Sequence, residues 1–121
     1  MPQRDVRLYL HDIAQAARLL AAFTDGKAWS DYQADALLRS GVERQFEIIG
    51  EALSQACRVD PGLADQISHC RPIIAFRNRL IHGYFSVNIE VVWNTAEHDL
   101  TPLEAHAQAM LSQLEQEAQG G

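Results

Sequence analysis

Apolar residues that recur at steps of three and four constrain the fold of this chain most strongly. One set near the N-terminus consists of Val6, Leu10, Ile13, Ala17 and Leu20. A second set keeps the same rhythm and consists of Val42, Phe46, Ile49, Leu53 and Ala56. This spacing places each set on one face of an α-helix, whereas a half-buried strand would alternate apolar and polar residues. The sequence therefore predicts amphipathic helices that pack against one another.

Capping and helix-breaking residues predict where these helices begin and end. The predicted helices span about 4–24, 30–58 with a bend at 40–41, a short turn up to about 68, 72–83, 88–99 and 101–117. The candidate N-caps are Ser30 or Asp31, Asn88 and Thr101, and Pro72 and Pro102 suit a first helical turn. We expect an all-α, up-and-down bundle of four to six helices. It would form a single domain over residues 1–118, followed by a frayed tail at 119–121.

Composition narrows the class of protein. The chain has 121 residues, 47% of them hydrophobic, which suits one folded domain. No apolar run approaches the roughly 18 residues of a membrane helix, and the first residues lack the apolar block of a signal peptide. Cys57 and Cys70 show neither metal-ligand spacing nor a redox-pair motif, so we expect reduced, partly buried thiols. These features predict a cytoplasmic protein with no membrane association, metal or cofactor.

The charge distribution singles out one segment. The formal net charge of −6 argues against a general nucleic-acid coat. Between Gln66 and Ile89, however, there is no Asp or Glu. This acid-free window contains three arginines, Arg71, Arg77 and Arg79. A locally positive strip is what binding of phosphates requires, although chance clustering would give the same pattern.

The centre of the acid-free window reads Arg77-Asn-Arg-Leu-Ile-His82-Gly-Tyr84. Asn78 and His82 are four residues apart, so a helix places them on the same side. Arg77 is five residues from His82, about 140° around an ideal helix, and does not share that face. It could reach the same pocket if the helix unwinds at Gly83. A two-fold dimer could instead bring Arg77 of one copy to His82 of the other.

These residue types suit cleavage of RNA without a metal ion. Histidine can remove the proton of the 2′-hydroxyl or protonate the leaving 5′-oxygen near neutral pH, which gives His82 a catalytic role. Arg77 can hold two phosphate oxygens and stabilise charge in the transition state. Asn78 could bind a phosphate oxygen or orient the His82 ring, and Arg79 could contact RNA. A purely structural histidine at a helix end is the alternative that the residue types leave open.

The segment also carries a family resemblance. The string from Arg77 to Tyr84 resembles the Arg-Asn-x3-His-x-Tyr form of HepT-like toxins, within the HEPN superfamily and its Arg-x4-6-His motif. The segment from Val42 to Ala52 ends in Ile-Gly-Glu-Ala and resembles a helix of the same family. The resemblance extends from about Arg4 to Leu114, nearly the whole chain.

The resemblance implies a specific function. HEPN toxins are helical homodimers whose paired motifs line a cleft at the dimer interface, and many are metal-independent endoribonucleases. The resemblance therefore implies that Arg77 and His82 are catalytic. HepT-like members are typically paired with a minimal nucleotidyltransferase antitoxin, which can transfer AMP to the tyrosine of the motif, here Tyr84. The RNA substrate, and the choice between AMP transfer and occlusion by the antitoxin, stay open.

Other features leave alternatives. The acidic net charge suits a non-catalytic subunit that binds a nucleotide or a nucleotidyltransferase. For Glu47 and Glu51, which have helical spacing, salt bridges or dimer contacts are favoured over catalysis, and Glu51 could pair with Arg77. Trp29 and Trp93 are expected to be core or interface anchors. His69 also lies in the acid-free window and is of interest for that reason.

Overall fold

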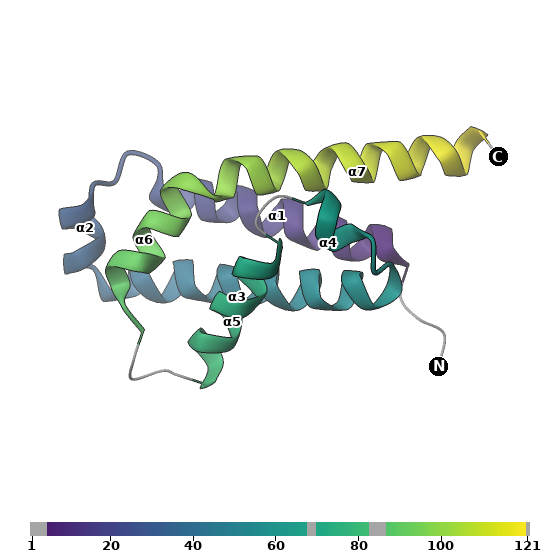
Figure 1. Cartoon of the computed structure of the whole chain (residues 1–121). Helices are drawn as coiled ribbons and strands as arrows, with labels where there is room; N and C mark the ends of the chain where they lie inside the picture. Colours follow the sequence, from purple (N-terminus) through teal and green to yellow (C-terminus); the bar gives the residue numbers. More distant parts are fainter. Residues whose placement is uncertain (1–4, 68–69, 83–86, 121) are drawn as a thin grey trace.

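The chain folds as a bundle of helices. The computed structural model describes residues 5–67, 70–82 and 87–120. These residues form seven helices, namely α1 (Val6–Thr24), α2 (Trp29–Ala34), α3 (Ala36–Val59), α4 (Leu63–Gln66), α5 (Cys70–His82), α6 (Ile89–His98) and α7 (Leu100–Gly120) (Figure 1). The predicted all-α class is confirmed. The count exceeds the predicted range because the second predicted helix is divided into α2 and α3.

Three long helices form the body of the bundle. α1 packs along α3 on one side and along α7 on the other, and α5 packs against α3 (Figure 1). α2 lies at one end of the bundle, and α6 leads into α7 there, whereas α1 begins and α7 ends at the opposite end. Within the described residues, no helix combines the length and apolar character needed to cross a membrane.

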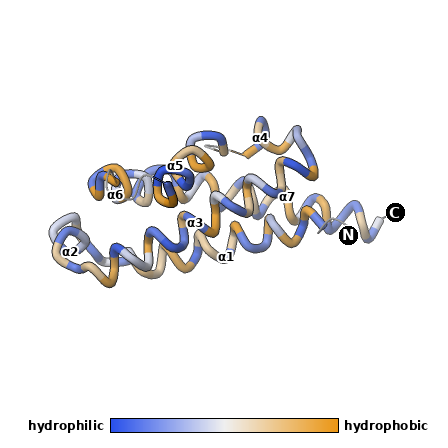
Figure 2. Tube along the Cα trace, turned by 90° about the horizontal axis from the view of Figure 1, so that it is seen from below, coloured by the Kyte–Doolittle hydropathy of each residue, from blue (hydrophilic) through white to orange (hydrophobic). Residues whose placement is uncertain are grey.

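The two predicted apolar faces form the core. Leu10, Ile13, Ala17 and Leu20 of α1 are fully buried, as are Val42, Phe46, Ile49, Leu53 and Ala56 of α3. Apolar and polar residues alternate along these helices with the helical period (Figure 2). Burial of each large side chain contributes roughly 1.5–3 kcal/mol relative to exposure, so these two faces account for much of the stability of the bundle. Phe23, near the end of α1, is 37% exposed.

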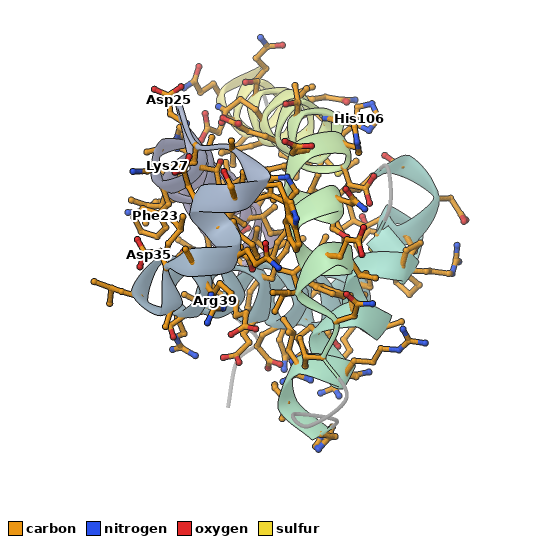
Figure 3. The ribbon with its side chains drawn as sticks, turned by 90° about the vertical axis from the view of Figure 1, so that its left-hand side faces the viewer. Phe23, Asp25, Lys27, Asp35, Arg39 and His106 are labelled. Carbon is orange, nitrogen blue, oxygen red and sulfur yellow. The ribbon has the colours of Figure 1, made fainter. Side chains whose placement is uncertain are left out.

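Helix α3 continues without a break through the bend predicted at 40–41, and the helix is interrupted at Asp35 instead. Its backbone is extended, with φ −111° and ψ 99°, and its side chain accepts the N–H of Leu38 at 3.1 Å, as an N-cap does. The Arg39 guanidinium donates to the carbonyl oxygen of Tyr32 at 3.2 Å and so ties α3 back to α2. Figure 3 shows Asp35 and Arg39 at this end of the bundle. Side-chain caps at a short turn, rather than the glycine, therefore divide the helix.

The other predicted helix starts were correct in part. α2 follows Ala28, and Asp31 accepts the Ala28 N–H at 2.8 Å from the third helical position instead of acting as the N-cap. Asn88 is an N-cap as predicted, because its side chain accepts the N–H two residues on at 2.9 Å. α7 begins one residue before Thr101, so the predicted cap at Thr101 is wrong. Proline one residue later is tolerated because N–H groups of the first turn lack helical partners.

Candidate active site

The core fixes the rotation of α5 about its own axis. Ile73 and Leu80 are buried, and the Phe76 ring packs edge-on against Phe46 of α3 with centroids 5.2 Å apart. Such edge-to-face aromatic pairs are favourable and directional. With these three side chains turned inward, the positions of all the polar residues of the motif are set by helix geometry.

Arg77 is held against α3. Its side chain is 23% exposed, and Nη2 donates to Glu51 Oε2 at 2.6 Å. Nη1 donates to the side-chain oxygen of Asn78 at 2.9 Å. Nε is buried and has no hydrogen-bond partner among the described residues. The predicted pairing of Glu51 with Arg77 is confirmed, and this ion pair orients the guanidinium.

Gly50 makes the close approach of Arg77 possible. A Cβ atom added at Gly50 would lie 2.3 Å from Arg77 Cβ and 2.6 Å from Arg77 Cγ. Both distances are too short for carbon atoms that are not bonded to each other. The absence of a side chain is thus required where α5 crosses α3. Within Ile-Gly-Glu-Ala, the glycine makes space for Arg77 and Glu51 binds it. The sequence had indicated the motif but not this contact, because residue spacing alone does not show which helices touch.

Arg77 lines a cleft of about 260 Å³ between α1, α3 and α5. Its charged lining residues are Asp12, Arg44, Glu47, Glu51 and Arg77. Three carboxylates thus face two guanidinium groups. Both arginines are paired, because Arg44 contacts Glu47 at 3.3 Å in addition to the pair described above. The prediction that Glu47 and Glu51 form salt bridges is confirmed, and the cleft of a single chain has no excess positive charge.

Pairing also alters the predicted positive strip. Arg71 contacts Asp65 at 3.2 Å, and Arg77 contacts Glu51, so carboxylates from outside the acid-free window neutralise two of its three arginines. Arg79 makes no ion pair with any residue that the structure describes. It lines a separate groove between α5 and α6. The strip was predicted from the sequence, which cannot show carboxylates that approach from neighbouring elements.

His82 does not share the cleft with Arg77. It is the last residue of α5, is exposed, and is not among the described residues that line the cleft. Asn78, four residues earlier, is also exposed. Helical structure is kept through His82, so no distortion before this residue turns Arg77 towards it. A single chain therefore leaves the two predicted catalytic residues on different sides of α5.

Three predicted features fall outside the described residues, namely the helix terminator Gly83, Tyr84 and His69. In the parts of the chain that the structure describes, no group of three or more His, Cys, Asp or Glu side chains is placed to hold a metal ion. Trp93 is buried, and its ring packs against that of Tyr32 in a tilted arrangement with centroids 5.1 Å apart. Trp29 is partly buried against the core. Both tryptophans are thus core anchors, as predicted.

A family model described as ribonuclease HepT-like matches residues 13–110, a range that contains Gly50, Glu51, Arg77 and His82. The chain belongs to the HepT-like ribonuclease family. This membership confirms the family predicted from the motif, and it confirms the predicted class of enzyme, an endoribonuclease.

Individual relatives of this HepT-like chain match along most of their length. A probable ribonuclease HepT of Thermococcus cleftensis is 34% identical over 102 residues, which cover 84% of this chain and 92% of the relative. An RNase candidate of Caldanaerobacter subterraneus is 30% identical over 105 residues, covering 87% and 93%. Another, of Methanocaldococcus jannaschii, is 25% identical over 117 residues, covering 95% and 94%. No solved structure matches the chain.

Proposed function

We propose that this HepT-like ribonuclease cleaves RNA without a metal ion and that Arg77 and His82 are its catalytic pair. The observation that carries the proposal is the fixed position of Arg77, which Gly50 and Glu51 of α3 hold at the edge of a cleft. An arginine whose orientation is set before substrate binds needs little reorganisation to stabilise a transition state. His82 is exposed at the end of the same helix and accessible to RNA.

In the proposed reaction, the 2′-oxygen forms a new bond to the neighbouring phosphorus and the bond between phosphorus and the 5′-oxygen breaks. His82 removes the proton of the 2′-hydroxyl as this oxygen attacks phosphorus, or protonates the 5′-oxygen as its bond to phosphorus breaks. The guanidinium of Arg77 binds the non-bridging oxygens, whose negative charge grows in the transition state. Asn78 and Arg79, on the exposed side of α5, contact the RNA backbone.

We further propose that two copies of the chain complete each site. The separation of Arg77 and His82 around α5 supports this proposal, because the helix continues through His82 and His82 is not among the described residues that line the cleft of Arg77. Two apolar side chains are exposed close to the cleft, because Leu19 is 41% and Ile81 42% exposed. Ile81 lines the cleft of Arg77, Leu19 lines the neighbouring cleft, and Ile48 lines both. Exposed apolar surface of this kind is typical of an interface. In a homodimer, Arg77 of one copy would face His82 of the other.

The biological role that we propose is that of the toxin in a toxin–antitoxin pair located in the cytoplasm. Its antitoxin would be a minimal nucleotidyltransferase that transfers AMP to Tyr84. This residue is two positions beyond His82 in the sequence. A phosphate and a nucleoside attached there would oppose RNA binding by charge and by bulk. The support for this role is the family resemblance and the intact motif.

Cleavage of a synthetic RNA by the purified chain, in the presence of a chelator, tests the catalytic proposal. We expect wild-type protein to cut and the His82→Ala variant to lose at least about a hundredfold in rate, the size typical of a general acid or base. The matched control is His98→Ala, which removes an exposed histidine from the last turn of α6. Cutting that survives His82→Ala, or that requires added metal, would overturn the proposal.

A further inference from the structure

The two cysteines of the chain, separated by 13 positions, are in contact. Their Sγ atoms lie 3.6 Å apart, with Cys57 near the end of α3 and Cys70 at the start of α5. Cys57 is half-buried, whereas Cys70 is only 1% exposed. Both are free thiols. The sequence predicted reduced, partly buried thiols but not this contact, because only the packing of α5 on α3 brings them together.

This contact lies along the same interface between α3 and α5 as the contact that positions Arg77. Cys57 lies seven residues after Gly50 on α3, and Cys70 lies seven residues before Arg77 on α5. Seven residues are about two helical turns, so each pair of positions lies on one stripe of its helix. The contacts Gly50–Arg77 and Cys57–Cys70 therefore lie about two turns apart along the interface of one antiparallel helix pair.

We propose that Cys57 and Cys70 are a site of reversible oxidation, at which a small-molecule disulfide of the glutathione type converts the two thiols into an intramolecular disulfide that staples α3 to α5. The thiolate of Cys57 attacks one sulfur of the small disulfide, which stays on Cys57 as a mixed disulfide, while the other half leaves as a small thiol. The thiolate of Cys70 then attacks the Cys57 sulfur and releases the second small thiol. Two protein protons leave with the two small thiols, so atoms and electrons balance.

Burial assigns the order of these steps. Cys57 is accessible enough for a small disulfide, whereas Cys70 is enclosed by the core. Burial, together with the hydrogen bond to Cys57, raises the pKa of the Cys70 thiol to about 12, which makes it the poorer first nucleophile. Closure requires the sulfur atoms to approach by about 1.5 Å, to the bond length of ~2.05 Å.

The disulfide would stabilise the folded protein and would hold α3 and α5 together at their interface. It closes a loop of the chain between α3 and α5 that contains α4. A cross-link of this loop length restricts the unfolded chain far more than a folded protein in which the sulfurs already touch. Because folding and disulfide formation are thermodynamically linked, the factor by which the disulfide stabilises the folded state is also the factor by which folding raises the equilibrium constant for forming the disulfide. For a loop of about 15 residues this factor is on the order of a hundredfold. The inference rests on the packing of α3 and α5 and not on the proposed ribonuclease mechanism.

Equilibration of the purified chain in buffers of reduced and oxidised glutathione tests the inference. Closure is measured after acid quenching as the loss of two hydrogens in the intact mass, and peptide mapping locates the Cys57–Cys70 link. At a fixed concentration of reduced glutathione, we expect half-closure of the native protein at a concentration of oxidised glutathione roughly a hundredfold lower than in urea. The unfolding temperature of the closed form should rise by several degrees, on the order of 5–10 °C.

Two variants serve as controls. Cys57→Ser removes the more accessible thiol, and Cys70→Ala removes the buried thiol without placing a hydroxyl in the core. Cys57→Ser keeps only the buried thiol, which should not react, and Cys70→Ala allows at most a glutathione adduct on the half-buried Cys57. In both variants, oxidised glutathione should leave the unfolding temperature within about 1 °C of that of the reduced variant. Equal closure in native buffer and urea, or glutathione adducts on both cysteines of the folded wild-type protein, would overturn the inference.

Discussion

Gly50 of α3 and Arg77 of α5 lie so close that a Cβ atom at position 50 would stand 2.3 Å from the Cβ atom of Arg77. The residue after the glycine, Glu51, binds the Arg77 guanidinium at 2.6 Å. One helix therefore sets the arginine of the motif both by the space it leaves and by the charge it supplies. This relationship connects the two segments by which the sequence resembles HepT-like proteins.

The first prediction concerns Gly50→Ala. Alanine usually stabilises a helix interior by about 1 kcal/mol relative to glycine. At position 50 its methyl group must displace the Arg77 side chain, and overpacking of this kind costs about 1–3 kcal/mol. We expect a net loss in the free energy of unfolding, measured in urea, together with a loss of RNA cleavage.

Gly41→Ala is the matched control for this prediction. Gly41 also lies within α3, but a Cβ atom there would meet only the Phe23 ring, at an ordinary contact distance of 3.5 Å. This variant should be as stable as the wild type or more stable, by up to ~1 kcal/mol. If both alanine variants unfold at the same urea concentration, the close contact with Arg77 does not exist in solution.

The second prediction concerns Glu51→Gln, which keeps the size of the side chain and removes its charge. Because Glu51 is 47% exposed, solvent screens the ion pair, and the loss of stability should stay below ~1 kcal/mol. Cleavage should fall more than stability, by about tenfold or more, because Arg77 loses the group that orients it. Glu47→Gln, on the same face of α3, should leave cleavage near the wild-type rate. An unchanged rate for Glu51→Gln would show that Arg77 acts without its partner.

The third prediction is a pH dependence of stability at Glu43. Burial raises the pKa of this carboxyl, and nearby Glu47 adds to the effect while Arg39 opposes it. The folded protein thus holds the proton more tightly than the unfolded chain. The resulting stability is present below the unfolded pKa of about 4.3 and is lost as the pH rises through the higher folded pKa.

Glu43→Gln removes this penalty. Its unfolding temperature should exceed that of the wild type at pH 7 and match it at about pH 3.5, with a gain below ~1 kcal/mol because solvent reaches the side chain. Thermal unfolding followed by circular dichroism at both pH values measures the difference. A gain that is the same at both pH values would mean that the effect is not due to ionisation.

The fourth prediction concerns Tyr84. Coexpression with a cognate nucleotidyltransferase should add the mass of AMP to the wild-type chain and abolish its RNA cleavage, because the added phosphate opposes RNA. Tyr84→Phe lacks the acceptor hydroxyl and should keep both its unmodified mass and its activity. Tyr9→Phe, a change of the same kind on α1, should be modified like the wild type. Equal modification of the Tyr84→Phe variant would remove this residue from the regulatory scheme.

The sequence was sufficient to predict the helical class and the core, and it was less informative about contacts between helices. Apolar periodicity correctly identified the buried residues of α1 and α3, because burial on one face of a helix follows directly from spacing. The break at Asp35 was missed, because a glycine at position 41 is the more obvious interruption in the sequence, whereas the side chains of Asp35 and Arg39 hold the actual turn.

The candidate site shows the same limit. The sequence identified Arg77 and His82 and predicted that an ideal helix separates them, and the structure of α5 agrees. It did not predict the role of Gly50 or the contact of Cys57 with Cys70, because both depend on the register in which α3 and α5 cross. The assignment of Arg77, His82, Asn78, Arg79 and Tyr84 to their roles stays a prediction.

The most direct test of the central claim, that two chains complete one ribonuclease site, is a complementation measurement. Arg77→Ala and His82→Ala chains, each inactive alone, are coexpressed with different tags, and the mixed dimer is purified and assayed on RNA. If Arg77 of one chain acts with His82 of the other, a mixed dimer retains one intact site of two, about half the wild-type rate. A mixed dimer with no more activity than either variant alone would contradict the claim.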